Sequence, residues 1–179
     1  MGCWQALQAA QQLAELGQAA GNASRWKREA DLIHDWVDEN CWSDQLGAYT
    51  MVAGEDELDA SVLLHAPSGF HRGERMRSTI AALRRDLGSG PLLYRFTGAE
   101  AEGERPFVAC SFWLVAALAC IGEMHEASAL MDELVQRAND VGLYAEMMDE
   151  DGTFWGNFPQ ALSHLGLIDA ALTIADLRP

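Results

Sequence analysis

The feature that most constrains the fold is a repeated order of helices. An apolar helix, a glycine break, an amphipathic helix and an extended stretch follow one another three times, over residues 4–51, 58–96 and 107–155. Helices that are apolar on nearly every side are buried, whereas amphipathic helices have one face in water. The alternation therefore predicts an all-α fold in which an inner ring of helices is surrounded by an outer ring.

The repeat gives six helices in pairs and a seventh with no partner after it. The expected helices cover residues 4–16, 23–40, 58–64, 76–87, 106–121, 125–138 and 158–175. The three extended stretches fall at the same point of each unit, so we expect them to form short β-hairpins that gather at one rim. Two of these stretches would bring Arg95 and Glu146 to that rim.

Charge and length narrow the classes of function. The chain has 179 residues, which is long enough to bury a hydrophobic core, so we expect a single domain that covers residues 1–179. The net charge of −15 argues against a nucleic-acid partner or an anionic membrane. A neutral ligand fits better, because no basic cluster is available to hold a phosphate. No apolar run reaches the roughly 18–20 residues that a membrane span needs.

The cysteines and histidines predict neither a metal site nor a cofactor. None of the four cysteines forms a C-x-x-C pair, and the histidines lack the mutual spacing of metal ligands. We therefore expect no metal and no cofactor, and a reducing, cytoplasmic compartment.

The segment 142–168 holds the clearest candidate for chemistry. Glu146 is the single carboxylate in a short apolar stretch, and Asp-Glu-Asp-Gly at 149–152 predicts a turn that leads to a return strand at 153–155. Asn157 and Pro159 then indicate the start of the last helix. A partly desolvated carboxylate on such a ribbon is suited to act as a general base.

Three groups of motifs resemble glycoside hydrolase family 15, which contains glucoamylases, glucodextranases and trehalases. The first is Leu-Asp-Ala-Ser-Val-Leu-Leu at 58–64. The second is Tyr-Arg-Phe at 94–96 with Phe-Val-Ala-Cys-Ser-Phe-Trp-Leu-Val at 107–115. The third is Gly-Leu-Tyr-Ala-Glu at 142–146 with Gly-Asn-Phe-Pro-Gln-Ala-Leu-Ser-His at 156–164. The resemblance implies a partial (α/α)6 barrel, in agreement with the two rings expected from the repeat.

The resemblance also implies a reaction. The family hydrolyses α-glucosidic bonds with inversion, using one carboxylic acid and one carboxylate base. Glu146 matches the position of the base, and Arg95 matches an arginine that holds sugar hydroxyls. Phe107 is a weak counterpart of the family's aromatic platform, and Trp155 is a further candidate for stacking on a sugar. The implied substrate is an α-glucan oligosaccharide or an α-glucoside disaccharide.

In the family, the general acid precedes the helix that matches residues 4–16. Seven of twelve helices would be represented, so we expect this chain to be the C-terminal part of the catalytic barrel and to be inactive alone. The open edge predicts self-association or an N-terminal half-barrel partner. A glucoamylase-like hydrolase is the first interpretation. Leu162 stands where glucoamylases carry a tryptophan, so a trehalase stays open, as does a non-catalytic fragment.

Each candidate residue also has an ordinary structural alternative. Arg95 can form a surface ion pair with one of the acidic residues at 100, 102 and 104. Trp155 can be a hairpin aromatic that closes the core. Asp59 can contact a sugar, but its position favours a cap on the following short helix. The tryptophans on helical stripes, including Trp36, are expected in the core.

Overall fold

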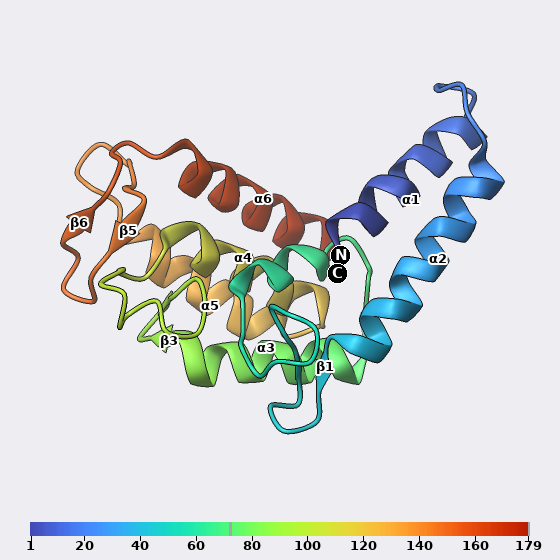
Figure 1. Ribbon diagram of the computed structural model, residues 1–179. Helices are drawn as coiled ribbons and strands as arrows, with labels where there is room; N and C mark the ends of the chain where they lie inside the picture. The colour runs from blue at the N-terminus through green and yellow to red at the C-terminus, as the bar shows by residue number, and fades with distance from the viewer. Residues whose placement is uncertain (72, 179) are drawn as a thin grey trace.

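Glycine breaks and helix caps divide the chain into helices and short hairpins (Figure 1). The computed structural model describes residues 1–71 and 73–178. In these residues the helices are α1 (Gly2–Glu15), α2 (Ala23–Asn40), the 3-10 helix η1 (Ala60–His65), α3 (Glu74–Leu87), α4 (Val108–Cys120), α5 (Met124–Val135) and α6 (Ala161–Leu177). The expected all-α class is confirmed.

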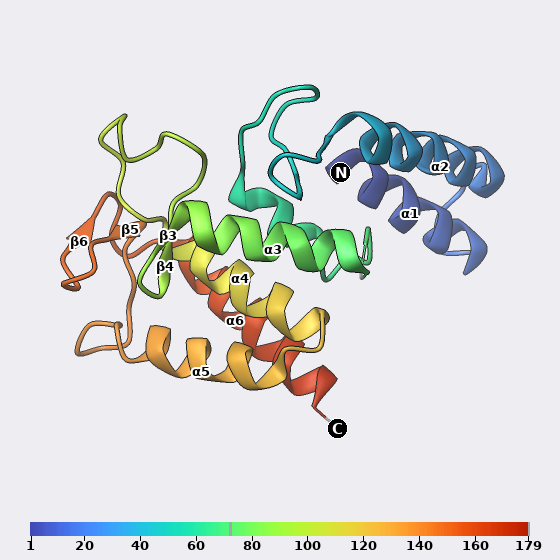
Figure 2. The same cartoon turned by 90° about the horizontal axis from the view of Figure 1, so that it is seen from below.

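Three antiparallel two-stranded hairpins connect the helices. They pair β1 (Trp42–Ser43) with β2 (Ala48–Tyr49), β3 (Gly88–Ser89) with β4 (Leu92–Leu93), and β5 (Met147–Met148) with β6 (Phe154–Trp155). The last two hairpins gather at one end of the molecule, whereas β1–β2 lies apart from them against α3 (Figures 1 and 2). The expectation that all three would meet at one rim is therefore met by two of them.

Helix α4 is the centre of the packing. All its residues from Val108 to Ala119 are buried except Trp113, which is partly exposed. It packs against α6, α5 and η1, and Figure 2 shows α5 and α6 on one side of α3 and α4, with the α1–α2 hairpin on the other. Burial on every side explains why its sequence lacks a polar face.

Helix α6 approaches α4 closely because Gly166 lies in their interface. A Cβ at Gly166 would be 3.2 Å from the Cβ of Phe112 and 3.4 Å from the carbonyl oxygen of Ala109. The other buried residues of α6 are Ser163, Ala170 and Ile174. Small side chains on this face thus let the two inner helices pack backbone against backbone.

The structure differs from the expected start of one helix, from the expected type of another and from the expected burial of one tryptophan. The last helix begins at Ala161 rather than near residue 158, because Asn157 and Gln160 pair with Glu146 and Tyr144 through backbone hydrogen bonds of 2.9 Å. The helix expected at 58–64 is the 3-10 helix η1. Trp36 is 54% exposed and therefore does not belong to the core.

The buried residues form one hydrophobic cluster that extends from Trp4 in α1 to Ile174 in α6. Large apolar side chains are nonetheless exposed along α6 and along the α1–α2 hairpin. Among residues 1–71 and 73–178, no helix combines the length and apolar character needed to cross a bilayer.

Candidate active site

The Glu146 carboxylate is held where the β5–β6 hairpin leads into α6. Its Oε2 accepts hydrogen bonds from the backbone nitrogen of Asn157 at 3.0 Å and from Asn157 Nδ2 at 2.9 Å. The Glu146 backbone is held as well, since its nitrogen donates to Asn157 O at 2.9 Å and its carbonyl accepts from Val108 N at 3.0 Å. The half-buried carboxylate is therefore fixed by Asn157, while the backbone of Glu146 is anchored to the first residue of the buried helix α4.

Arg95 follows β4 and forms an ion pair with Glu104. Arg95 Nε donates to Glu104 Oε2 at 2.8 Å, and Nη2 donates to Oε1. The ion pair expected as the ordinary alternative is therefore present. Hydrogen bonds from Arg95 hold the pKa of the Glu104 carboxyl below its usual range, so both groups are charged at neutral pH. The Nη1 edge of the guanidinium remains outside this pair.

Phe107 joins the Arg95 and Glu146 segments. Its nitrogen donates to Leu93 O in β4 at 2.8 Å, and its backbone bridges Met147 in β5. The Arg95 guanidinium carbon lies 5.5 Å from the centre of the Phe107 ring. Phe107 is only 8% exposed, which leaves little of its surface for a ligand. The sequence candidates Arg95, Phe107 and Glu146 are thus brought onto one continuous stretch of rim.

Trp155 is exposed on the same hairpin and is held by polar contacts. Its Nε1 donates to Asp149 Oδ2 at 2.7 Å, and the Arg105 guanidinium carbon lies 5.4 Å from the centre of an indole ring. Arg105 Nε is 3.3 Å from Asp149 Oδ1. Because Trp155 is 44% exposed, it does not close the core. Its indole is available to a ligand in a defined orientation.

Asp59 caps η1, as its position in the sequence indicated. Its Oδ1 accepts a hydrogen bond from Ser61 N at 2.6 Å. The segment also lies beside the residues that follow β4, because Asp59 bridges Phe96 and Ala60 N donates to Arg95 O at 2.7 Å. Asp59 thus helps to place the segment that carries Arg95.

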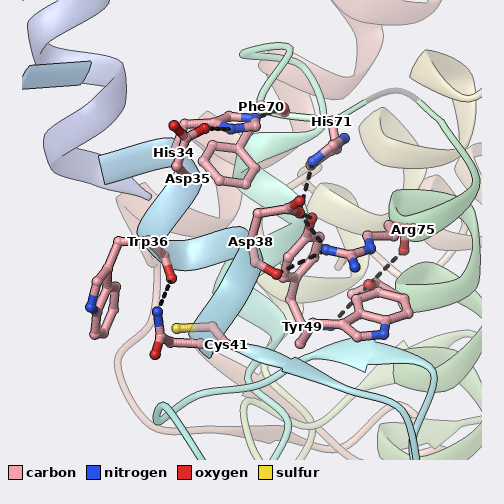
Figure 3. Close-up of polar contacts among 12 residues, drawn as sticks. His34, Asp35, Trp36, Asp38, Cys41, Tyr49, Phe70, His71 and Arg75 are labelled. Carbon is pink, nitrogen blue, oxygen red and sulfur yellow. Dashed lines mark hydrogen bonds and ion pairs between the residues drawn. The ribbon is translucent and has the colours of Figure 1, made fainter. Parts of the chain in front are cut away.

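A second polar cluster, which the sequence analysis did not identify, joins α2, the β1–β2 hairpin and α3 (Figure 3). Asp38 Oδ1 accepts from the buried Tyr49 hydroxyl at 2.5 Å and lies 2.6 Å from Arg75 Nη1 and 3.1 Å from His71 Nε2. Burial and the hydrogen bond to Asp38 raise the pKa of Tyr49. These contacts join three elements of the N-terminal half of the chain, whereas Glu146 lies in the C-terminal half.

Gly156 and Asn157 are the site residues that sequence reasoning missed. The sequence indicates a helix start at Asn157, yet both the backbone and the side chain of this residue contact Glu146. The hairpin predicted around residues 149–152 could have indicated this contact, because it brings residues 156 and 157 next to residue 146. In residues 1–71 and 73–178, no three His, Cys, Asp or Glu side chains are grouped to hold a metal ion.

Paired helices joined by loops with short hairpins are the arrangement found in the helical-barrel glycosidases. The chain belongs to glycoside hydrolase family 15, because the family model "Glycosyl hydrolases family 15" matches residues 1–124. Arg95 and Phe107 lie within the matched residues, whereas Glu146 and Trp155 follow them.

Curated relatives cover nearly the whole chain. It is 36% identical to a trehalase of Mycolicibacterium smegmatis over 96% of this chain and 27% of that protein. A trehalase of Mycobacterium tuberculosis is also 36% identical, over 96% of this chain and 26% of its own length. A trehalase of Thermoplasma acidophilum is 33% identical over 82% of this chain and 26% of that protein. The chain thus spans about a quarter of these relatives.

Solved structures share the fold at lower identity. A wild-type glycosidase superimposes with a TM-score of 0.80 at 21% identity, over 97% of this chain and 50% of that chain. A glycosidase variant in complex with glucose gives a TM-score of 0.82 at 20% identity, over 98% of this chain and 50% of that chain. The expected partial (α/α)6 barrel is confirmed by these matches.

Proposed function

We propose that this chain supplies the general base and a sugar-binding arginine to an enzyme that hydrolyses α-glucosidic bonds with inversion. The observation that carries the proposal is the shared rim. Phe107 bonds to Leu93 in β4, two residues before Arg95, and bridges Met147, while the next residue, Val108, bonds to the carbonyl of Glu146. A carboxylate with one oxygen held by hydrogen bonds can act as the base that such a reaction needs. The Arg95 donors that Glu104 does not use can bind hydroxyls of the sugar.

In the proposed reaction, the oxygen of a water molecule attacks the anomeric carbon while Glu146 Oε1 accepts a proton from that water. The bond from that carbon to the leaving oxygen breaks on the opposite face, and a carboxylic acid outside this chain protonates the leaving oxygen. Arg95 donates through Nη1 to hydroxyls of the bound glucose. The Phe107 ring packs against the Arg95 guanidinium. The exposed indole of Trp155 stacks on the sugar on the leaving side of the cleaved bond.

Trehalose is the substrate that the relatives favour over a maltodextrin. The three relatives named above are all trehalases, and each is at least 33% identical to this chain. Leu162, where glucoamylases carry a tryptophan, agrees with a preference other than a glucose polymer. An α-glucan oligosaccharide is the second candidate, because the family also contains glucoamylases.

Residues 1–179 would form one domain, the C-terminal part of the catalytic barrel, with the general acid on a segment that precedes it. The chain spans about a quarter of its curated relatives, which leaves ample length for the remaining helices. An enzyme that has the base but lacks the general acid loses most of its rate acceleration, so we expect the isolated chain to have no measurable turnover.

The test is glucose release from trehalose and from maltooligosaccharides, by the complete protein and by this chain alone. We expect the complete protein to release glucose from trehalose faster, with β-glucose formed from one of its two rings. Release by neither form would favour a non-catalytic fragment. Release by the isolated chain would mean that the acid lies within residues 1–179 and would overturn the proposed division of roles.

A further inference from the structure

We propose that Gly156 and Asn157 are a positioning element for the Glu146 carboxylate, which holds Oε2 and leaves Oε1 for the attacking water. The inference rests on the proposed role of Glu146 as the base. Neither residue would touch the substrate. Their effect on the rate would come from where they place the carboxylate.

The hydrogen bonds to Glu146 are confined to one of its oxygens. Oε2 accepts from Asn157 N at 3.0 Å and from Asn157 Nδ2 at 2.9 Å, which satisfies that oxygen. Among the described residues, none donates a hydrogen bond to Oε1. The two oxygens therefore have different roles: Oε2 is held by Asn157, and the lone pairs of Oε1 can accept a proton from water.

Asn157 holds the backbone of Glu146 in the same contact. Its carbonyl accepts from Glu146 N at 2.9 Å, so one residue binds both the main chain and the carboxylate of the proposed base. The adjacent pair Met147 and Trp155 continues the β5–β6 ladder. Rotation of the Glu146 side chain away from Asn157 would break two hydrogen bonds, one of them to a rigid backbone donor.

Gly156 makes this contact sterically feasible. Its φ is +73°, a conformation that favours glycine. A Cβ at this position would lie 2.7 Å from Glu146 Oε2 and 3.1 Å from Glu146 Cβ. Any larger residue would therefore push the carboxylate off Asn157, even if the backbone kept its conformation.

Gly152, in the turn of the same hairpin, provides a matched control. Its φ is +88°, and a Cβ there would meet no atom within 4 Å. Gly156→Ala and Gly152→Ala therefore carry the same kind of backbone strain, and only the first reaches Glu146. A displacement of about 1 Å in a catalytic group can lower the rate roughly 100-fold.

The experiment compares these variants in the complete protein, with kcat and KM for glucose release from trehalose and a thermal melt for each. We expect Gly156→Ala to lower kcat about 100-fold with little change in KM, and Gly152→Ala to stay within about threefold of the wild type. Equal effects of the two alanines on kcat would overturn the positioning role, because strain in the hairpin would then explain both.

Asn157 gives an independent measurement. Asn157→Ala removes one donor and is expected to lower kcat roughly tenfold, in line with one charged hydrogen bond. Asn157→Asp places a like charge against Glu146, so its kcat should fall below that of Asn157→Ala at an unchanged melting temperature. Aspartate that restores activity relative to alanine would contradict the proposal.

Glu146→Gln distinguishes the proposed role of Glu146 as the base from the proposed positioning of its carboxylate by Gly156. Loss of activity in Glu146→Gln, together with equal kcat values for the two glycine variants, would retain the base and reject only its positioning by Gly156. Full activity in Glu146→Gln would reject the proposed function itself.

Discussion

Two of the three guanidinium nitrogens of Arg95 are bonded to Glu104, so Nη1 is the nitrogen through which Arg95 can bind a sugar. Glu104 takes the Nε and Nη2 donors side-on, and the aromatic rings of Phe96 and Phe107 lie 5.4 and 5.5 Å from the guanidinium carbon. The group is thus oriented before any ligand arrives. Preorganised donors lose less entropy on binding than free ones do.

Glu104→Gln should weaken substrate binding more than it slows the chemistry. Glutamine has the shape of glutamate but only one acceptor oxygen, so the guanidinium would become mobile. In the complete protein we expect KM for trehalose to rise about tenfold, equivalent to about 1.4 kcal/mol, with kcat nearly unchanged. The exposed Glu102, on the same loop, provides the control Glu102→Gln. A fall in kcat at constant KM would argue against this role.

Asp38 links the stability of the chain to pH. Burial raises the pKa of its carboxyl, but hydrogen bonds from Tyr49 and Arg75 and the charges of Arg75 and His71 outweigh burial and hold the pKa below its usual value. A carboxyl with a lowered folded pKa stabilises the fold above its unfolded pKa of about 3.9 and loses that contribution as the pH falls further.

Asp38→Asn should therefore cost stability at pH 7 and cost less at pH 3. The measurement is the free energy of unfolding in urea at both pH values. Asp35→Asn is the control, because Asp35 lies on the same helix with a side chain that is 75% exposed. A loss of stability that is the same at both pH values would show that the ionised carboxyl contributes nothing.

At the scale of elements, the packing of α6 on α4 depends on small residues. Gly166→Val would place two methyl groups where a Cβ alone is already 3.2 Å from Phe112 Cβ. We expect a loss of about 1–3 kcal/mol of stability, as for other overpacked cores. Gly166→Ala should cost less, because alanine favours a helix by about 1 kcal/mol over glycine and offsets part of the crowding. Chemical denaturation of both variants distinguishes them, and a neutral valine variant would contradict the close packing.

The helices were predictable because their signals are local. Apolar periodicity and glycine breaks gave every helix within a few residues, and Asp59 was recognised as a cap from its position. The start of α6 was misplaced, because long-range pairing of residues 157 and 160 with the β5 segment overrode the local helix signal.

The candidate site was predictable only in part. The helical repeat predicts that Arg95 and Glu146 share a rim, and the resemblance adds Phe107 and the role expected of each residue. The backbone pairing that joins their loops is not specified by any local pattern. The contact of Asn157 with Glu146 joins residues 11 positions apart across a hairpin. The Asp38 cluster joins residues up to 37 positions apart, from three elements.

The whole molecule has an open side. α6 is apolar on nearly every face, as α4 is, yet it exposes Leu162, Leu165, Ile168 and Leu172 by 40% to 61%. Figure 1 shows this helix along the upper edge of the molecule, with the α1–α2 hairpin projecting on the right. A contiguous apolar stripe of this kind is typical of a surface covered in the complete assembly.

The isolated chain should therefore self-associate. We expect sedimentation velocity to show species larger than a monomer at micromolar concentration, and the pair Leu165→Glu and Leu172→Glu to shift the chain toward the monomer. Val141→Glu is the control, because Val141 is 69% exposed and lies in the turn after α5 rather than on α6. A stable monomer of the unmodified chain would contradict the account of the open edge.

The most direct test of the central claim is glucose release from trehalose by the complete protein with Glu146→Gln, beside Glu150→Gln. Both residues lie on the last hairpin region, and Glu150 contacts Ser89 rather than the Arg95 rim. We predict that Glu146→Gln lowers kcat by about 10²–10⁴, the range for a general base, with KM nearly unchanged. Glu150→Gln should keep wild-type activity. Normal turnover in Glu146→Gln would contradict the assignment of the base and the function proposed for this chain.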